Sequence, residues 1–480
     1  MIARTIVSRC LPAVLSITVA LLTACGGGGG TTAGTGGGGG TNPPPSTANE
    51  WAWISGSSTA NQPGDYGTKG VASASNVPGA RSSAVSWTDS SGNFWLFGGN
   101  GYDAAGTQGA LNDLWEFSPT TKEWTWVSGS SAANNSGVYP TEGSAPDGDV
   151  PGARAAAVGW TDSSSNLWLF GGYGYGVSGD ANLLNDLWEF NTTTKQWTWV
   201  AGSEIVNQPG VYGTQGVASA GNTPGARDAA VGWTDNSGNL WLFGGDAIDS
   251  SGSGFINDLW EFNTTTKQWT WVGGSDTANQ PAVYGTQGVT SASSTPGARG
   301  PAATWTDSNG NFWLFGGLEG WFSGSGRVPV LNDLWEFSPA TNEWTWVSGS
   351  DTANQPGVYG TLGVASASNS PGTRSNAVSW TDSSGHFWLF GGEAIDSSGT
   401  YGDIDDLWEF NSMTKQWTWV GGSSTANQPG VYGTQGVATA STIAGARDSA
   451  VAWTDSSGNF WLFGGGWSAG SFNDLWRYQP

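Results

Sequence analysis

The sequence predicts an all-β protein in which one unit recurs six times around a closed ring. Thirty of the 32 tryptophans occupy five fixed positions of this unit. The last unit stops at a DLWRY phrase, and the EWAWI phrase that would complete it stands near the other end, at Glu50–Ile54. A repeat whose last strand stands at the N-terminus describes a ring of sheets, here a six-bladed β-propeller. The anchor phrase WLFGG recurs every 72 to 75 residues and ends at Gly99, Gly172, Gly245, Gly317, Gly392 and Gly465.

The first strand of a unit runs from a PGAR-like phrase to a tryptophan, as in Arg227–Trp233. Two positions on one face of this strand are small in every copy, as Ala230 and Gly232 are here. Small side chains fit where six strands converge on an axis. We therefore expect this strand to be the innermost.

The remaining three strands follow at short intervals. A TDSSGN phrase suits a tight hairpin, because Asp, Ser, Gly and Asn favour turn conformations. The second strand, Phe94–Phe97, is apolar at every position, which predicts burial on both faces. The third strand, Asp113–Phe117, and the fourth, Trp124–Val127, complete a four-stranded antiparallel blade wound outward from the axis.

This unit resembles the kelch repeat, and more closely the bacterial kelch-containing exported proteins grouped with the galactose oxidase propeller. The matching features are the double glycine after an apolar strand and the tryptophans of the third and fourth strands. The resemblance covers Glu50–Pro480 and implies kelch-like blades. About 25 additional residues, including the repeated Asn207–Gly213 phrase, separate each fourth strand from the next first strand.

The N-terminal segment predicts export. Residues 1–25 combine early arginines with an apolar stretch, as a signal peptide does. The LTAC phrase that ends at Cys25 resembles the lipobox of bacterial lipoproteins, which implies lipidation of this cysteine, and Gly26 implies sorting to the outer membrane. Residues 26–49 are rich in Gly, Thr and Pro and predict a flexible tether to the propeller of residues 50–480. We expect contact with the membrane only through the lipid anchor.

Charge and composition exclude several classes of function. The formal net charge of −23 disfavours nucleic acid, which requires clusters of Lys and Arg. The two cysteines, Cys10 and Cys25, both lie in the signal segment, so we expect no disulfide in the propeller. His386 is the only histidine, which argues against the copper site of galactose oxidase and against nucleophilic triads.

Candidate binding residues lie where the copies differ. The segments after the double glycines diverge, and they contain both tryptophans outside the template, Trp321 and Trp467. Such indoles could bind a sugar ring or cover a blade edge. By the kelch resemblance, six arginines would ring the channel mouth and could bind an acidic partner, or each could pair with the aspartate of its third strand. These arginines are Arg81, Arg154, Arg227, Arg299, Arg374 and Arg447.

Four carboxylates could gather at the same mouth: Asp228, Asp246, Glu393 and Asp448. They are either solvated loop carboxylates or oxygen ligands for calcium, although no spacing matches a known calcium loop. We therefore expect no cofactor, with calcium as the open alternative.

These observations favour a non-enzymatic binding or scaffold propeller at the cell surface or in the periplasm. We expect it to be monomeric and to recognise a protein or a glycan on its loop face. The alternative is a carbohydrate-active enzyme of the sialidase or glycosidase kind, with Asp246 or Glu393 in its carboxylate site. A purely structural envelope protein is a third hypothesis.

Overall fold

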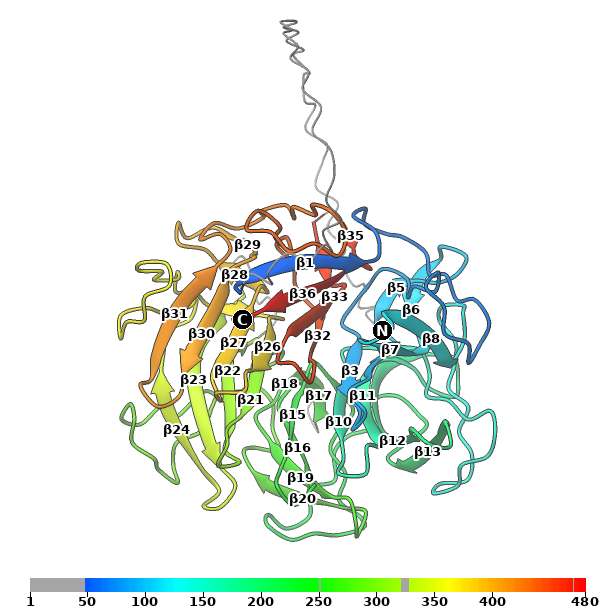
Figure 1. Cartoon of the computed structure of the whole chain (residues 1–480). Coiled ribbons are helices and arrows are strands. Elements are labelled where there is room, and N and C mark those ends of the chain that lie inside the picture. Colours follow the sequence, from blue (N-terminus) through cyan, green and yellow to red (C-terminus); the bar gives the residue numbers. More distant parts are fainter. Residues whose placement is uncertain (1–47, 250–251, 321–327, 469) are drawn as a thin grey trace, which may run out of the picture. The chain divides into compact units, whose positions relative to one another are not determined.

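The computed structural model describes residues 48–249, 252–320, 328–468 and 470–480. Every regular element in these ranges is a β-strand (Figure 1). Within the same ranges, no helix has the length and apolar character needed to cross a membrane. The all-β class predicted from the sequence is confirmed.

The strands fall into six units, numbered in chain order from Arg81. Unit one contains β2 (Arg81–Ser82), β3 (Val85–Thr88), β4 (Phe94–Phe97), β5 (Asn100–Tyr102), β6 (Gln108–Ala110), β7 (Leu114–Ser118) and β8 (Glu123–Ser128). Unit two contains β9 (Arg154–Ala155), β10 (Val158–Thr161), β11 (Leu167–Tyr175), β12 (Ala181–Asn191) and β13 (Gln196–Ala201). Unit three contains β14 (Arg227–Asp228), β15 (Val231–Thr234), β16 (Leu240–Phe243), β17 (Asp246–Asp249), β18 (Gly252–Phe255), β19 (Leu259–Asn263) and β20 (Gln268–Gly273).

The other three units follow the same plan. Unit four contains β21 (Ala303–Thr306), β22 (Phe312–Leu318), β23 (Val330–Ser338) and β24 (Glu343–Ser348). Unit five contains β25 (Arg374–Ser375), β26 (Val378–Thr381), β27 (Phe387–Phe390), β28 (Glu393–Ile395), β29 (Tyr401–Asp403), β30 (Leu407–Asn411) and β31 (Gln416–Gly421). Unit six contains β32 (Val451–Thr454), β33 (Phe460–Phe463), β34 (Gly466–Trp467), β35 (Gly470–Ser471), β36 (Leu475–Gln479) and, from the other end of the chain, β1 (Glu50–Ser55).

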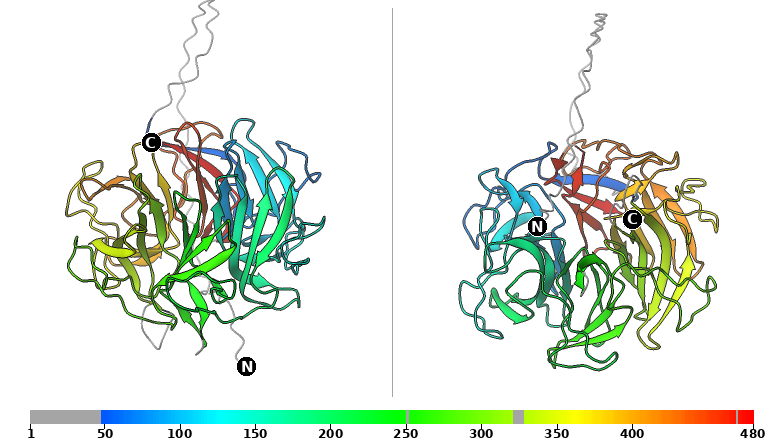
Figure 2. Two further views of the ribbon diagram at one scale, coloured as in Figure 1. Left: turned by 90° about the horizontal axis from the view of Figure 1, so that it is seen from below. Right: turned by 180° about the vertical axis from the view of Figure 1, so that it is seen from behind.

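Each unit is built on four antiparallel strands that pair in sequence order, as β3, β4, β7 and β8 do in unit one. In unit six the fourth strand is β1, which pairs with β36 in the order β1–β36–β33–β32 (Figure 1). The innermost strands contact one another in chain order, and β32 also contacts β3. Figure 2 shows the same sheets from two further directions.

The predicted first strand, Arg227–Trp233, is interrupted in the structure. Arg227 and Asp228 pair with β17, whereas Val231–Thr234 pair with β16. Between them Ala229 has a φ of 53°, a left-handed conformation that no strand can continue through. The sequence pattern missed this break because alanine gives no signal for positive φ.

The hydrophobic core lies between neighbouring sheets. Val85, Trp87 and Trp95 of unit one pack with Leu167 and Trp188 of unit two in one buried cluster, and five similar clusters occupy the other seams. The seam between units six and one is filled in the same way. A second strand that is buried on both faces therefore has no polar position, as its sequence predicts.

The template tryptophans line these seams. Twenty-four of the thirty are buried, and the six that are half-buried are the second tryptophans of the fourth strands, such as Trp126. Each of these six meets the edge of a tyrosine from the repeated insertion, as Trp126 meets Tyr66 at 5.1 Å between ring centroids. All thirty therefore pack against other side chains of the fold.

The repeated insertion covers the outer edge of each sheet. In unit one the backbone of Ser73 bridges to Trp124 of β8, and the amide of Gly70 donates to the carbonyl of Trp126. The side chain of Asn76 donates to the carbonyl of Trp124 at 2.9 Å. An unpaired strand edge invites aggregation, so this cover explains why the insertion recurs with every unit.

Candidate functional site

The side chains of the six arginines are buried inside the units, where each makes an ion pair. Arg81 is 1% exposed, its Nε donates to the carbonyl of Gly79, and its two terminal nitrogens donate to Asp113 at 2.8 and 2.7 Å. Asp113 also accepts from the hydroxyl of Tyr66 at 2.6 Å and from the indole of Trp115 at 2.7 Å. The same bidentate ion pair recurs as Arg154–Asp186, Arg227–Asp258, Arg299–Asp333, Arg374–Asp406 and Arg447–Asp474.

These contacts correct the list of candidate binding residues. A guanidinium that is buried and bonded to a buried carboxylate cannot receive an acidic partner. Arg81, Arg154, Arg227, Arg299, Arg374 and Arg447 are therefore structural side chains, as the pairing alternative proposed.

Two residues after each arginine, the backbones of adjacent units meet in what we call the inner ring. Five backbone hydrogen bonds run around it. The amide of Ser83 donates to the carbonyl of Ser449, that of Ala156 to Ser83, and that of Ala229 to Ala156. The amide of Asn376 donates to the carbonyl of Pro301, and that of Ser449 to Asn376. All five donors have φ between 52° and 57°. The sixth position is Pro301, which has no amide hydrogen to donate to Ala229.

Three carboxylates gather beside the inner ring, at the seam between units five and six. Glu393 of β28 lies directly opposite Asp403 of β29, and Asp448 approaches from unit six. One oxygen from each of the three lies within 4.8 Å of the others. We call these residues the mouth cluster.

Asp403 of the mouth cluster is 9% exposed, and Glu393 and Asp448 are half-buried. Burial, followed by the charge of Asp448, raises the pKa of Asp403 well above its usual value, and the two carboxyl groups hydrogen-bond each other. Burial and the charge of Asp448 also raise the pKa of Glu393, which accepts a hydrogen bond from the hydroxyl of Tyr401. Three charges held this close require protons or a cation between them.

The sequence predicted two members of the mouth cluster, Glu393 and Asp448, and missed the third. The other two predicted carboxylates, Asp228 and Asp246, form a separate pair opposite each other in unit three. The four therefore do not meet at one point. Asp403 could have been identified from the sequence, because it is the only carboxylate at its position of the repeat. The equivalent positions of the other units hold Ala110, Leu183, Phe255, Val330 and Ser471.

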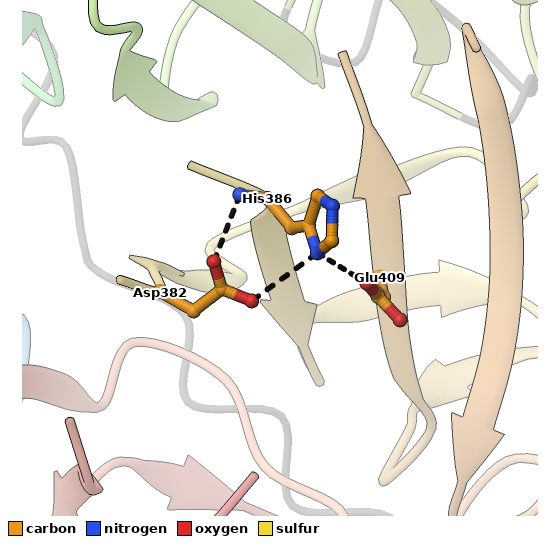
Figure 3. A group of neighbouring side chains, drawn as sticks. All are labelled: Asp382, His386 and Glu409. Carbon is orange, nitrogen blue, oxygen red and sulfur yellow. Dashed lines mark hydrogen bonds and ion pairs between the residues drawn. The ribbon is translucent and has the colours of Figure 1, made fainter. Parts of the chain in front are cut away.

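A second acidic group surrounds the only histidine of the chain (Figure 3). The Nδ1 atom of His386 lies 2.7 Å from Glu409 Oε1 and 3.4 Å from Asp382 Oδ2. The Nε2 atom lies 3.1 Å from the side-chain amide of Asn411. A neutral imidazole with its proton on Nδ1 satisfies both contacts, because Nε2 then accepts from Asn411.

His386 takes the place of an asparagine that makes the same contacts in other units. In unit one Asn93 donates to Glu116 at 3.0 Å and to Asp89 at 3.2 Å. The histidine therefore fits a structural position of the repeat. Its three-residue group needs no metal to explain its geometry.

A cavity of about 480 Å³ adjoins this group and is lined by Asn49, Trp388 and Glu409, among others. At three other seams a lysine from the following unit fills the equivalent place. Lys195, for example, lies 4.3 Å from the centre of the Trp95 ring and 3.2 Å from Glu116. Lys267 and Lys415 make the same two contacts with the preceding unit. Asn49 has the equivalent position in the sixth unit, so no lysine enters this cavity.

The centre of the molecule contains a second cavity, of about 540 Å³. Each innermost strand contributes a small or hydroxyl residue, a tryptophan and a threonine, as Ser86, Trp87 and Thr88 do. The small residues predicted at the convergence of the strands therefore line this cavity. None of its eighteen lining residues is charged, so these side chains offer neither a carboxylate nor an imidazole.

Three predicted site residues cannot be placed. Trp321 and Cys25 lie outside the described residues. Trp467 belongs to the backbone of β34, and its side chain is outside the described part as well.

Comparison with known proteins agrees with this architecture. Residues 139–356 match the family described as the KLHDC2/KLHL20/DRC7 Kelch-repeats domain, a segment just under half of the chain. No curated protein sequence matches the chain. The matched segment and the repeated four-stranded antiparallel sheets together support a kelch β-propeller as the fold of this protein.

Proposed function

We propose that the protein is a non-enzymatic binding or scaffold propeller that holds a protein partner on the face that carries the inner ring. The observation that carries this proposal is the distribution of differences between units. The buried Arg–Asp pairs and the seams repeat six times, whereas the residues after the double glycines differ from unit to unit. A face that diverges on a rigid scaffold is typical of a recognition surface. The kelch family match supports a scaffold for protein binding.

We further propose that the six units are the blades of one closed ring, with β1 as the outermost strand of the last blade. The pairing of β1 with β36 supports this closure. The contact of β32 with β3 and the shared core between units six and one also support it. A closed ring removes the open sheet edges that a linear array would leave at its two ends.

The location of the protein is proposed from the sequence. Lipidation at Cys25 after removal of the signal, with residues 26–49 as a tether, would attach the protein to the cell envelope, at the outer membrane. Metabolic labelling with a palmitate analogue tests this step. The label should be incorporated into the wild type and lost in Cys25→Ser. Equal labelling of both would refute the lipid anchor.

The enzymatic alternative receives no support from the geometry. Asp246 and Glu393 belong to different units, so these two carboxylates do not form one catalytic pair. The uncharged central cavity supplies no acid or base. We therefore do not propose hydrolysis of a glycoside.

Partner binding is tested with two sets of variants. Trp321→Ala combined with Trp467→Ala changes the diverging segments, whereas Met413→Ser changes an 82% exposed residue in the short turn between β30 and β31, on the opposite face. Each protein is immobilised, and the envelope proteins it captures are quantified by mass spectrometry, with a glycan array as a parallel arm. Loss of one specific captured protein in the double variant alone supports the proposal. Capture that is unchanged in both, or glycan binding without a protein partner, would overturn it.

Gel filtration of the wild type tests the proposed monomer.

A further inference from the structure

The mouth cluster contains three carboxyl groups, and the arginines nearest to it in the sequence do not neutralise them. Glu393, Asp403 and Asp448 present oxygens within 4.8 Å of one another, and the buried Arg374 and Arg447 nearby in sequence are each committed to their own aspartate. Like charges at this distance repel strongly when partly buried. A bound cation would remove this repulsion.

A second, independent observation points to a ligand at the same place. Ser375 is 1% exposed, and its Oγ has no hydrogen-bond partner among the described residues. Ser375 lies directly opposite Glu393, which lies directly opposite Asp403. Directly opposed residues of antiparallel strands project from the same face, so the serine hydroxyl, Glu393 and Asp403 form one row. An unsatisfied buried hydroxyl costs free energy unless a ligand completes it.

Three carboxylates meet at only one of the seams between described units. The equivalents of Glu393, Asp403 and Asp448 at the seam of units one and two are Asn100, Ala110 and Ala155. At the seam of units three and four, Asp246 faces Phe255, and the next unit supplies Gly300. No other seam joins three carboxylates in the described part of the chain. The cluster is therefore an addition to the repeated scaffold and not a part of it.

We propose that Glu393, Asp403 and Asp448 bind one divalent cation of the calcium class, with the hydroxyl of Ser375 as a further oxygen ligand. Three carboxylates can supply up to about six oxygens, and calcium accepts six to eight oxygens in irregular geometry. Magnesium requires near-octahedral geometry and retains its waters, whereas zinc and copper favour imidazole and thiolate, which are absent from this cluster. The cation would join unit five to unit six, so it would stabilise the seam next to β1.

Calcium binding is measured by isothermal titration calorimetry with calcium chloride, after removal of metals with a chelator and with magnesium chloride as a parallel titration. The variants take their residues from unit one: Asp403→Ala reproduces Ala110, and Glu393→Asn reproduces Asn100. Asp246→Asn is the matched control, because it changes a carboxylate in the equivalent position of unit three. Thermal unfolding with and without calcium checks that each variant is folded.

The wild type should bind one calcium ion per chain, more tightly than magnesium, and its unfolding midpoint should rise with calcium. Asp403→Ala and Glu393→Asn should weaken binding by about tenfold or more, whereas Asp246→Asn should bind as the wild type does. Absence of calcium binding in the wild type would overturn the proposal, as would equal binding by Asp403→Ala. Partner capture on the diverging segments is a separate measurement, so failure of one proposal does not decide the other.

Discussion

Trp51 lies in the first strand of the described chain, and its indole ring packs 5.2 Å from the phenyl ring of Phe390 in unit five. The same indole also contacts Trp476 and Tyr478 of the last strand. Residues at the two ends of the chain thus share one buried cluster with unit five. The N-terminal strand is part of the core and not an appendage to it.

Replacement of Trp51 by alanine should therefore destabilise the whole assembly. Trp51 is 6% exposed, and truncation of a buried tryptophan typically costs about 3–5 kcal/mol because a cavity remains. The free energy of unfolding in urea measures the effect. Trp53→Ala is the control, because Trp53 is half-buried in the same strand and should cost less. Equal losses for the two variants would contradict the role of Trp51 in the seam.

Removal of one buried arginine should cost more than removal of a surface lysine. Arg154→Ala leaves the carboxylate of Asp186, whose side chain is 0% exposed, without its ionic partner, and we expect a loss of about 3–5 kcal/mol. Lys195→Ala breaks an ion pair with the half-buried Glu116 and should cost less than about 1 kcal/mol. Urea unfolding of both variants at one ionic strength gives the comparison. Similar losses would show that the buried pair is not the stronger interaction.

Asp405 should make the stability depend on pH. Its side chain accepts from the amide of Ser423 at 3.0 Å, and burial raises its pKa from 3.8 to about 6. Because the folded protein holds this proton more tightly than the unfolded chain, the stabilisation is complete below about pH 4. It is lost as the pH rises through about 6. The equivalent residues are asparagines, and Asn332, for example, also donates to the carbonyl of Pro371 in the next unit.

Asp405→Asn should therefore be more stable than the wild type at pH 7, and the difference should shrink toward pH 4 by roughly 2–3 kcal/mol. Unfolding in urea at a series of pH values measures it. The reciprocal variant Asn185→Asp introduces the same carboxyl in unit two, where Asn185 now donates to the carbonyl of Pro224. It should lose stability above pH 6. A difference between Asp405→Asn and the wild type that does not vary with pH would refute this explanation.

A lysine at position 49 should fill the cavity beside Trp388. Asn49 has a φ of 65°, close to the 60° of Lys195, so the backbone already suits a lysine. The hydroxyl of Tyr478 donates to Asn49 and would lose its acceptor, so the variant is Asn49→Lys with Tyr478→Phe. The new ammonium on Trp388 and Glu409 should add about 0.5–1 kcal/mol relative to Tyr478→Phe alone. A melting temperature equal to that of Tyr478→Phe would contradict this prediction.

The sequence predicted those features that repeat. Three such features are the small residue at Gly232, the apolar strand Phe94–Phe97 and the pairing of Arg81 with Asp113. Each has a counterpart in all six units, so comparing the six copies within this one sequence reveals them. Of the mouth cluster, Glu393 and Asp448 were predicted and Asp403 was missed, because a carboxylate at its position occurs in unit five alone and no repeat marks it. Positive φ at Ala229 was not predicted, since the hydrogen bond that holds it comes from another unit.

The substitution of proline at position 301 gives the inner ring a definite weak point. At five of its six junctions the residue two positions after the arginine donates a backbone hydrogen bond, and at the junction of units three and four it does not, although the amide of Gly245 still donates to the carbonyl of Arg299 there. The end of the molecule that carries the mouth cluster therefore lacks one backbone hydrogen bond, between Ala229 and Pro301, whereas the junction of units five and six keeps the bond from Ser449 to Asn376. Sequence changes near Pro301 thus act on a junction that already has one bond fewer than the others.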